Sequence, residues 1–167
     1  MATLRRLTPD DLPQIHRLEA ETYLASLHES DEAFLRLIDL FPDGAVGAFD
    51  GDELCAYAFA VPLPAGSVLE LKAPLRELAP GADMFYIHDV AVGSRHRGRG
   101  LARGLVEAML DLARTRGMRT SELVSVQGSA PFWQRFGFRR VEEFEYAPGA
   151  RATKMALSLG ATLPDRQ

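Results

Sequence analysis

The sequence predicts a single domain of the α/β (α+β) class. At 167 residues, of which 47% are apolar and 25% charged, the chain has the size and composition of one globular domain with a substantial core. Two apolar runs joined by Asp-Gly-Asp-Glu indicate an antiparallel hairpin. The run from Met84 to Val92, followed by a glycine-arginine turn and an amphipathic segment, indicates a strand, a turn and a helix. Strands and helices therefore share one domain over residues 1–167.

The N-terminal segment is predicted to hold one strand and two helices. Leu4 to Leu7 has the pattern of a strand, and Thr8 is placed to cap the helix that follows. Ser30 is a second N-cap, before the run D-E-A-F-L-R-L-I-D-L-F, and Pro42 ends that helix. We expect the two helices to lie over the sheet as a flap.

The next segment is predicted to form a hairpin and then a long irregular connection. The hairpin strands are Ala45–Phe49 and Leu54–Val61. Residues 62–83 form a proline-rich insert in which regular structure should be short and broken. Long loops often carry function, so we assign this insert to the side of the site at which a substrate binds. Its prolines are Pro62, Pro64, Pro74 and Pro80.

The C-terminal half is predicted to alternate strands and helices. Periodicity and glycine positions give a central strand at 84–92, a helix at 101–116 closed by Gly117, a strand at 121–126, a short helix at 129–136, and strands at 138–141 and 153–159. Residues 160–167 are predicted to be a frayed tail.

The turn after the central strand has the composition of an anion-binding cradle. Gly98 and Gly100 allow the backbone to approach a ligand closely, and the following helix begins with its positive dipole end. Guanidinium groups make charge-assisted bonds to phosphate. We therefore expect a phosphorylated ligand. The basic side chains around the turn are Arg95, His96, Arg97, Arg99 and Arg103.

Two common phosphate loops fit this turn poorly. A P-loop requires a Gly-Lys pair, which the chain lacks. A dinucleotide-binding turn requires glycine where Arg103 stands. A basic surface loop, without a bound phosphate, is the competing interpretation. A nucleic-acid-binding turn is a third, although the net charge of −4 argues against it.

The pattern R-x-x-G-x-G, formed by Arg95, Gly98 and Gly100, resembles the acetyl-CoA signature of the GNAT family of N-acetyltransferases. The preceding apolar strand and the following helix belong to that resemblance. The order of predicted elements also matches the layout of the family, which is a mixed, mainly antiparallel sheet of about seven strands with helices on both faces. The resemblance implies direct transfer of an acetyl group from acetyl-CoA to an amine in a ternary complex.

The resemblance also implies which residues contact the cofactor. In the family the central strand diverges from its neighbour, and the freed backbone groups pair with the pantetheine amides. The turn then holds the pyrophosphate through main-chain N–H groups. The residues that inherit these roles are Val90, Ala91, Val92, Arg95, Arg97, Gly98, Arg99, Gly100, Leu101, Ala102, Ser129 and Trp133.

A second motif, S-A-P-F-W-Q-R-F-G-F at 129–138, resembles the short helix that presents a tyrosine near the cofactor thiol in this family. Here Trp133 occupies the tyrosine position. An indole N–H donates a hydrogen bond but does not give up its proton at working pH. We therefore expect Trp133 to contact the sulfur or the pantetheine arm, or to pack in the core, and not to act as the acid.

Three further residues are candidates for the chemistry. An amine arrives protonated, and His88 lies where family members carry a residue proposed as general base. A buried structural histidine is the competing interpretation. Strand alternation predicts that Asp89 points away from His88 and serves as a structural acceptor. Tyr86 and Tyr146 are candidates for orienting the substrate or protonating the thiolate, although a thiolate can leave without an acid.

The remaining expectations concern partners and location. The acceptor is an amine of a small molecule or peptide, and acidic residues of the N-terminal half, Glu19 and Glu29 among them, could line its site. No metal is expected, because the four histidines are scattered. A single cysteine and the lack of an apolar span favour a cytoplasmic protein without membrane or nucleic-acid partners. Sheet edges would allow a homodimer. An acyl-CoA-binding regulatory module without turnover is the rival function.

Overall fold

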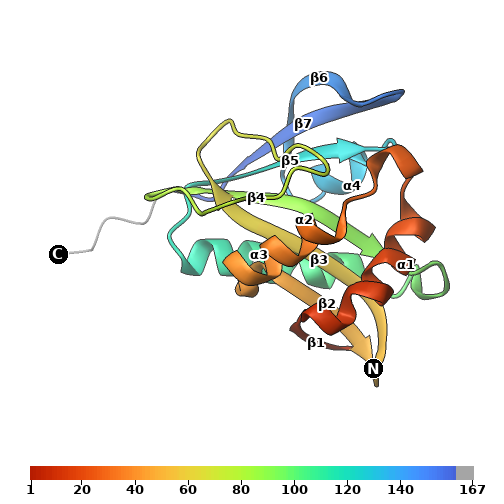
Figure 1. The fold of residues 1–167 in the computed structure, drawn as a ribbon. Helices are drawn as coiled ribbons and strands as arrows, with labels where there is room; N and C mark the ends of the chain where they lie inside the picture. The colour runs from red at the N-terminus through yellow and green to blue at the C-terminus, as the bar shows by residue number, and fades with distance from the viewer. Residues whose placement is uncertain (161–167) are drawn as a thin grey trace.

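The computed structural model describes residues 1–160 and shows one seven-stranded sheet in the order β1-β2-β3-β4-β5-β7-β6 (Figure 1). All neighbouring strands are antiparallel except β4 and β5, which are parallel. The expected mixed, mainly antiparallel sheet is confirmed. The strands are β1 (Thr3–Arg6), β2 (Ala45–Asp50), β3 (Glu53–Leu63), β4 (Met84–Val92), β5 (Thr120–Val126), β6 (Arg139–Ala147) and β7 (Ala150–Ser158).

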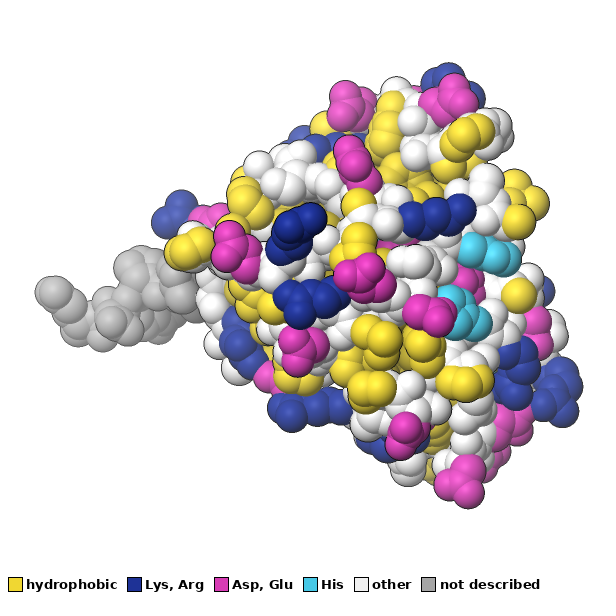
Figure 2. All heavy atoms as spheres, in the orientation of Figure 1, with side chains coloured by type: hydrophobic (Ala, Val, Ile, Leu, Met, Phe, Trp, Pro, Cys, Tyr) yellow, Lys and Arg dark blue, Asp and Glu magenta, His cyan; other side chains and the backbone are white. Residues whose placement is uncertain are grey.

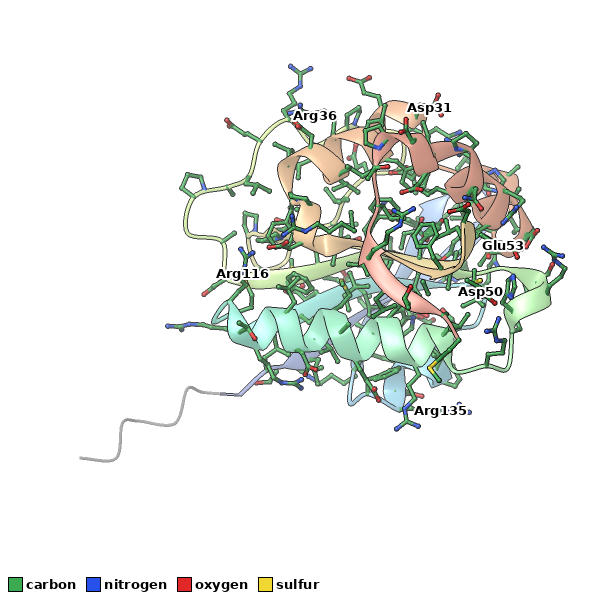
Figure 3. The ribbon with its side chains drawn as sticks, turned by 90° about the horizontal axis from the view of Figure 1, so that it is seen from below. Asp31, Arg36, Asp50, Glu53, Arg116 and Arg135 are labelled. Carbon is green, nitrogen blue, oxygen red and sulfur yellow. The ribbon has the colours of Figure 1, made fainter. Side chains whose placement is uncertain are left out.

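Helices cover both faces of the sheet, as expected. α1 (Leu12–Thr22) and α2 (Asp31–Leu40) lie on one face, and α3 (Leu101–Thr115) and the short α4 (Ala130–Gln134) lie on the other (Figure 3). Ser30 caps α2 by accepting a hydrogen bond from the Ala33 N–H at 3.2 Å. Phe34 on the inner side of α2 stacks on Phe59 of β3, with ring centroids 4.9 Å apart. This packing places the start of the α1–α2 connection above the end of β4.

The last hairpin is longer than the sequence predicts. β6 runs to Ala147 and not to residue 141, and β7 begins at Ala150. The turn between them contains Gly149, whose φ of 73° is in the left-handed region. The acidic run Glu142 to Glu145 gave no apolar strand signal because β6 is an exposed edge strand, where charged side chains are favoured.

β4 and β5 part after four paired residues. Their register runs from Met84 opposite Thr120 to Ile87 opposite Leu123, and no pairing is made beyond it among the described residues. β5 continues with β7 as its neighbour, while β4 continues with β3. A wedge-shaped gap therefore opens between the ends of β4 and β5.

The insert crosses the same end of the molecule. Between residues 64 and 83 the structure has turns but no helix or strand, and the segment lies beside β4, β5 and the β6–β7 hairpin (Figure 1). β3 extends through Pro62 to Leu63, so the irregular part begins two residues later than predicted. Of the predicted tail at 160–167, residues 161–167 lie outside the described part of the chain.

Candidate active site

A cavity of about 340 Å³ lies in the gap between β4 and β5. Its wall combines residues from the end of α1, the α1–α2 connection, β4, β5, α4 and β6. Eight of the residues singled out from the sequence line it, namely His88, Val90, Val92, Arg97, Ala102, Ser129, Trp133 and Tyr146. The other predicted catalytic and cofactor-binding residues do not line it: Tyr86, Ala91, Arg95, Gly98, Arg99, Gly100 and Leu101.

A β-bulge at His88 shapes the wall formed by β4. Phe59 pairs with Asp89, but the next residue, Ala60, pairs with Ile87, so His88 is the extra residue. The bulge interrupts side-chain alternation, and His88 and Asp89 both line the cavity. The prediction that Asp89 points away from His88 is therefore wrong, because alternation holds only for a regular strand.

The imidazole of His88 is held by the carboxylate of Glu29. Nε2 lies 3.0 Å from Glu29 Oε2, and the two side chains are 2% and 4% exposed. An ionised carboxylate can only accept, so Nε2 carries the hydrogen and the lone pair of the neutral ring is on Nδ1. Nδ1 is buried and has no partner among the described residues. The ring nitrogen that can accept a proton is therefore unpaired in a residue that lines the cavity.

Electrostatics set the protonation of His88. Burial lowers the pKa of His88, but the hydrogen bond to Glu29 and its charge, with the charges of Asp89 and Glu19, raise that pKa above its usual value of 6.5. Glu29 is itself fixed, since its Oε1 accepts from Lys72 N–H at 2.6 Å and its own N–H donates to Glu19 Oε2 at 2.7 Å. The insert is thereby joined to His88 through one carboxylate.

Asp89 lies in a less hydrated environment than an exposed carboxylate. Its Oδ2 accepts from the Tyr57 hydroxyl at 2.9 Å, and its Oδ1 is buried without a partner in the described part of the chain. Burial raises the pKa of Asp89 to about 7, against the lowering effects of His88, Tyr57 and Tyr23. This carboxyl therefore exchanges its proton near neutrality.

The exposed edge of β4 is partly occupied from α1. Gly93 N–H donates to Cys55 O on β3 at 2.8 Å, so by alternation the main-chain groups of Val90 and Val92 face the gap. The Tyr23 hydroxyl donates to Val90 O at 2.6 Å. Val90 N–H has no acceptor within residues 1–160. The Thr22 hydroxyl also donates to Val92 O, at 3.5 Å, so both acceptors of this edge have partners while the Val90 N–H remains available to a ligand.

The turn before α3 has the geometry of an anion site. Gly98 and Gly100 adopt φ values of 79° and 76°, and open space surrounds the position of a Cβ at both. Gly100 is the N-cap of α3. The main-chain N–H groups of residues 98–103 meet no acceptor in the described part of the chain. They and the dipole of a 15-residue helix are available to a phosphate.

The arginines of the turn differ in their partners. Arg97 lines the cavity and donates to Glu21 O at 3.1 Å. Arg95 pairs with Glu53, and Arg99 contacts His96 Nδ1 at 2.9 Å. Arg103 pairs with Glu107 one turn further along α3. Arg97 is thus the arginine placed at the cavity itself.

The second motif forms the wall opposite β4. Trp133 on α4 is 7% exposed, lines the cavity and packs edge-on against Phe132 and Phe138. The hydroxyls of Ser129 and Ser125 are 2.8 Å apart at the start of this helix. Trp133 therefore has both positions that the sequence suggested, in the core and at the cavity.

The two predicted tyrosines are placed differently. Tyr86 is 1% exposed, lies outside the cavity wall and stacks on the His88 ring with centroids 6.0 Å apart. Tyr146 lines the cavity and donates to Leu69 O of the insert at 2.6 Å. Burial raises the pKa of both hydroxyls. Tyr86 therefore packs against the ring of His88, and the hydrogen bond of Tyr146 links β6 to the insert.

Sequence reasoning missed the contact of Tyr23 with Val90, the pairing of Glu29 with His88, and the unpartnered Oδ1 atom of Asp89. Glu29 and His88 are 59 residues apart, and Tyr23 and Val90 are 67 apart. The acidic composition of the N-terminal half was the one signal that pointed toward Glu29. No pattern in the sequence marks the bulge.

Among residues 1–160, no group of three His, Cys, Asp or Glu side chains has the arrangement of a metal site. No described helix combines the length and apolarity needed to cross a bilayer. Lys and Arg side chains are interspersed with Asp and Glu on the face seen in Figure 2.

The fold combines a gap between two splayed strands with a helix N-terminus whose main-chain N–H groups are unpaired among residues 1–160. The sequence matches the model of the acetyltransferase (GNAT) family over residues 12–138. The chain belongs to the GNAT family. Acetyl-CoA is the cosubstrate of this family.

Individual relatives agree with the assignment. The glucosamine 6-phosphate N-acetyltransferase of Trypanosoma brucei brucei is 34% identical over 62 residues, which are 37% of this chain and only 42% of that protein. The loading GNATL domain of CurA from Lyngbya majuscula superimposes with a TM-score of 0.81 at 16% identity, covering 95% of this chain and 98% of that one. Arabidopsis thaliana Naa50, solved with the bisubstrate analogue CoA-Ac-MVNAL, gives a TM-score of 0.72 at 17% identity, covering 94% and 98%. These two structures are similar in fold.

Proposed function

We propose that the chain transfers the acetyl group of acetyl-CoA to a primary amine of a small molecule or peptide, directly and within a ternary complex. One observation carries the proposal. The buried His88–Glu29 pair leaves the lone pair at Nδ1 unpaired among the described residues, and His88 lines a cavity between splayed strands. The trypanosomal relative is named for an amino sugar, and the Arabidopsis structure contains a peptide-like analogue, so an amine is the shared feature.

Acetyl-CoA would bind along the gap. Main-chain N–H groups from Arg97 to Ala102 would hold the pyrophosphate, with Arg97 adding charge. The pantetheine arm would lie between Val90–Val92 and Trp133, with Ser129 beside it. Val90 N–H is free to stabilise the oxyanion that develops on the acetyl oxygen. The occupied Val90 carbonyl leaves fewer main-chain acceptors for the arm than the family pattern implies.

The amine would enter from the insert. A second cavity of about 560 Å³ is lined by the insert and the β6–β7 hairpin, and it shares Leu71 and Tyr146 with the first. The carboxylate of Glu29, which lines the first cavity, favours a cationic amine there. His88 Nδ1 would take the ammonium proton, which frees the nitrogen lone pair for attack on the acetyl carbon.

A pH–rate profile tests the role of His88. The neutral ring is the active form, so kcat/KM should rise with pH through the pKa of His88, which Glu29 holds above 6.5. His88→Gln should lose about 10²-fold in rate, the lower end for a missing general base, and should lack this limb. His16→Gln, which changes a half-exposed histidine on α1, should retain it. An unchanged limb in His88→Gln would remove His88 from the mechanism.

The rival function, a binding module without turnover, is not favoured. The relatives named above include N-acetyltransferases, and a positioned base has no purpose in simple binding. We further propose a cytoplasmic location without nucleic-acid or membrane partners, which the net charge of −4 and the single, buried cysteine support. The edges at β1 and β6 offer pairing groups through which a homodimer could form.

A further inference from the structure

An acid that protonates the departing thiolate would ease its loss, and Trp133 cannot supply that proton. The indole N–H does not ionise at working pH, and Tyr146 directs its hydroxyl to Leu69 O of the insert. Tyr86 lies outside the cavity wall. The proton donor is therefore a different hydroxyl at the cavity.

Tyr23 brings such a hydroxyl to the gap. It follows α1, lines the cavity and places its oxygen 2.6 Å from Val90 O on the edge of β4 that faces the gap. A phenol hydroxyl turns freely about its C–O bond, so it can exchange this acceptor for another one nearby. The sulfur of a thioester whose carbonyl is held at Val90 N–H would be such an acceptor.

Behind Tyr23 stands a carboxyl group with one open oxygen. Asp89 lines the same cavity, and its Oδ1 is buried and unpartnered in the described part of the chain. Its other oxygen is fixed by the Tyr57 hydroxyl at 2.9 Å. The charge of Asp89 also acts on the neighbouring hydroxyl of Tyr23. Tyr57, Asp89 and Tyr23 thus form a cluster of polar groups beside the gap.

We propose that Tyr23 is the catalytic acid that protonates the departing thiolate, and that Asp89 replaces its proton. This assignment rests on the proposed function. The C–S bond of the tetrahedral intermediate breaks with its electron pair on sulfur. The Tyr23 proton then moves to sulfur, while the proton of Asp89 moves to the Tyr23 oxygen. Tyr23 ends the step as a neutral phenol and Asp89 as a carboxylate.

The remaining protons balance through the amine. The ammonium group loses two protons as it becomes an amide. His88 passes one of them to solvent, and the other restores Asp89. The products are the amide, the thiol and one released proton, and no further reactant is needed.

Proton affinities support the pairing of these groups. Burial raises the pKa of Tyr23 well above 10, and so does the charge of Asp89, so Tyr23 alone would be a weak acid toward a thiolate. The pKa of Asp89 is about 7 in the presence of His88, Tyr57, Glu19 and Tyr23. Transfer from Asp89 to a thiolate of pKa about 8.5 is favourable by roughly 30-fold. The relay supplies the acidity that the phenol lacks.

A change of leaving group tests the assignment. Acetyl-CoA and its selenium analogue, in which a selenoester replaces the thioester, would be compared in the wild-type protein and in Tyr23→Phe. A selenol is a stronger acid than a thiol, so its anion leaves without a proton. Tyr23→Phe should lower kcat for acetyl-CoA by about 10²-fold or more and lower that for the selenoester far less. Asp89→Asn should show the same selectivity, because an amide does not pass on a proton.

Thr22→Val is the matched control. It removes the neighbouring hydroxyl, which lines the same cavity and lies 2.8 Å from Leu18 O and 3.5 Å from Val92 O, with no hydrogen bond to Asp89 or Tyr23 among the described residues. It should affect both esters equally. If kcat falls equally on both esters in Tyr23→Phe and Asp89→Asn, or does not fall, the assignment of Tyr23 and Asp89 is overturned and the proposed function is not. A wild-type protein that consumes neither ester with any amine would overturn the proposed function as well. Thermal unfolding of each variant separates these results from misfolding.

Discussion

The bulge in β4 places two adjacent titratable residues on one face and gives them different partners. His88 meets an ionisable carboxylate, Glu29, which favours the charged ring. Asp89 meets the phenol of Tyr57 and little water, which favours the neutral acid. Because the two sites are neighbours, their protons come off in steps that belong to the pair. Opposite roles as base and acid follow from these surroundings.

Removing the charge of Glu29 should move the titration of His88. In Glu29→Gln the pKa of His88 should fall, because the charge and hydrogen bond that raise it are lost or weakened. The rising limb of the pH–rate profile should therefore shift to lower pH, and NMR titration of His88 should show the same shift. Glu32→Gln on the exposed side of α2 is the control. A limb that stays in place would show that Glu29 does not set the pKa of His88.

The residues of the site were only partly predictable. Val90, Val92, Arg97 and Trp133 line the cavity where the resemblance places them. Glu29 and Tyr23 could not be assigned their contacts, because these join segments about 60 residues apart. The roles of all these residues remain proposals.

At the scale of elements, the turn between β4 and α3 allows the cost of an unfavourable backbone conformation to be measured without any loss of side-chain packing. Gly98 and Gly51 both have positive φ, at 79° and 60°, and a Cβ at either would meet no atom within 4 Å. Alanine at either site should therefore cost about 1–2 kcal/mol through the backbone alone.

Only one of the two substitutions should affect CoA. Gly98→Ala should weaken CoA binding in calorimetry, because it displaces the N–H groups that hold the pyrophosphate. Gly51→Ala, in the β2–β3 hairpin, should lose similar stability in thermal unfolding and bind CoA normally. Equal CoA affinity in both variants would place the pyrophosphate elsewhere.

Regular elements with strong patterns were predictable, and exposed ones were not. β4 spans Met84–Val92 and α2 follows the Ser30 cap, as the apolar pattern and the capping residue indicate. β6 is longer than its apolar signal, because an edge strand needs no buried face. The mixed, mainly antiparallel sheet was implied by the resemblance, but the parallel pairing of β4 with β5 was not predicted, since periodicity does not determine strand order.

At the scale of the whole molecule, the buried carboxyl of Asp89 should reduce stability as pH rises. Its pKa is 3.8 in the unfolded chain and about 7 in the folded one, so the folded state binds more protons between these values. The stability contribution of Asp89 is complete below about pH 4 and is lost as pH rises to 7. Each pKa unit is worth about 1.4 kcal/mol.

Asp89→Asn should remove this dependence. The variant should unfold at a higher temperature than the wild type at pH 8, and the difference should shrink toward pH 4. Asp11→Asn is a control of opposite sign. Burial raises the pKa of Asp11, but bonds from Arg5 and Thr8 lower it below 3.8 overall, so its contribution is present above that pH and lost in acid. Identical pH dependence in Asp89→Asn and wild type would show that Asp89 ionises freely. A gain in stability with a loss in rate is the trade-off expected of a functional site.

Amine-dependent release of CoA is the direct test of the central claim. The purified protein would be mixed with acetyl-CoA and a panel of small amines and peptides, with free thiol followed by absorbance and products by mass spectrometry. The account predicts that at least one amine releases CoA at a rate that saturates and becomes acetylated in equal amount. Release of CoA at the same rate without any amine, or no release with the whole panel, would contradict it.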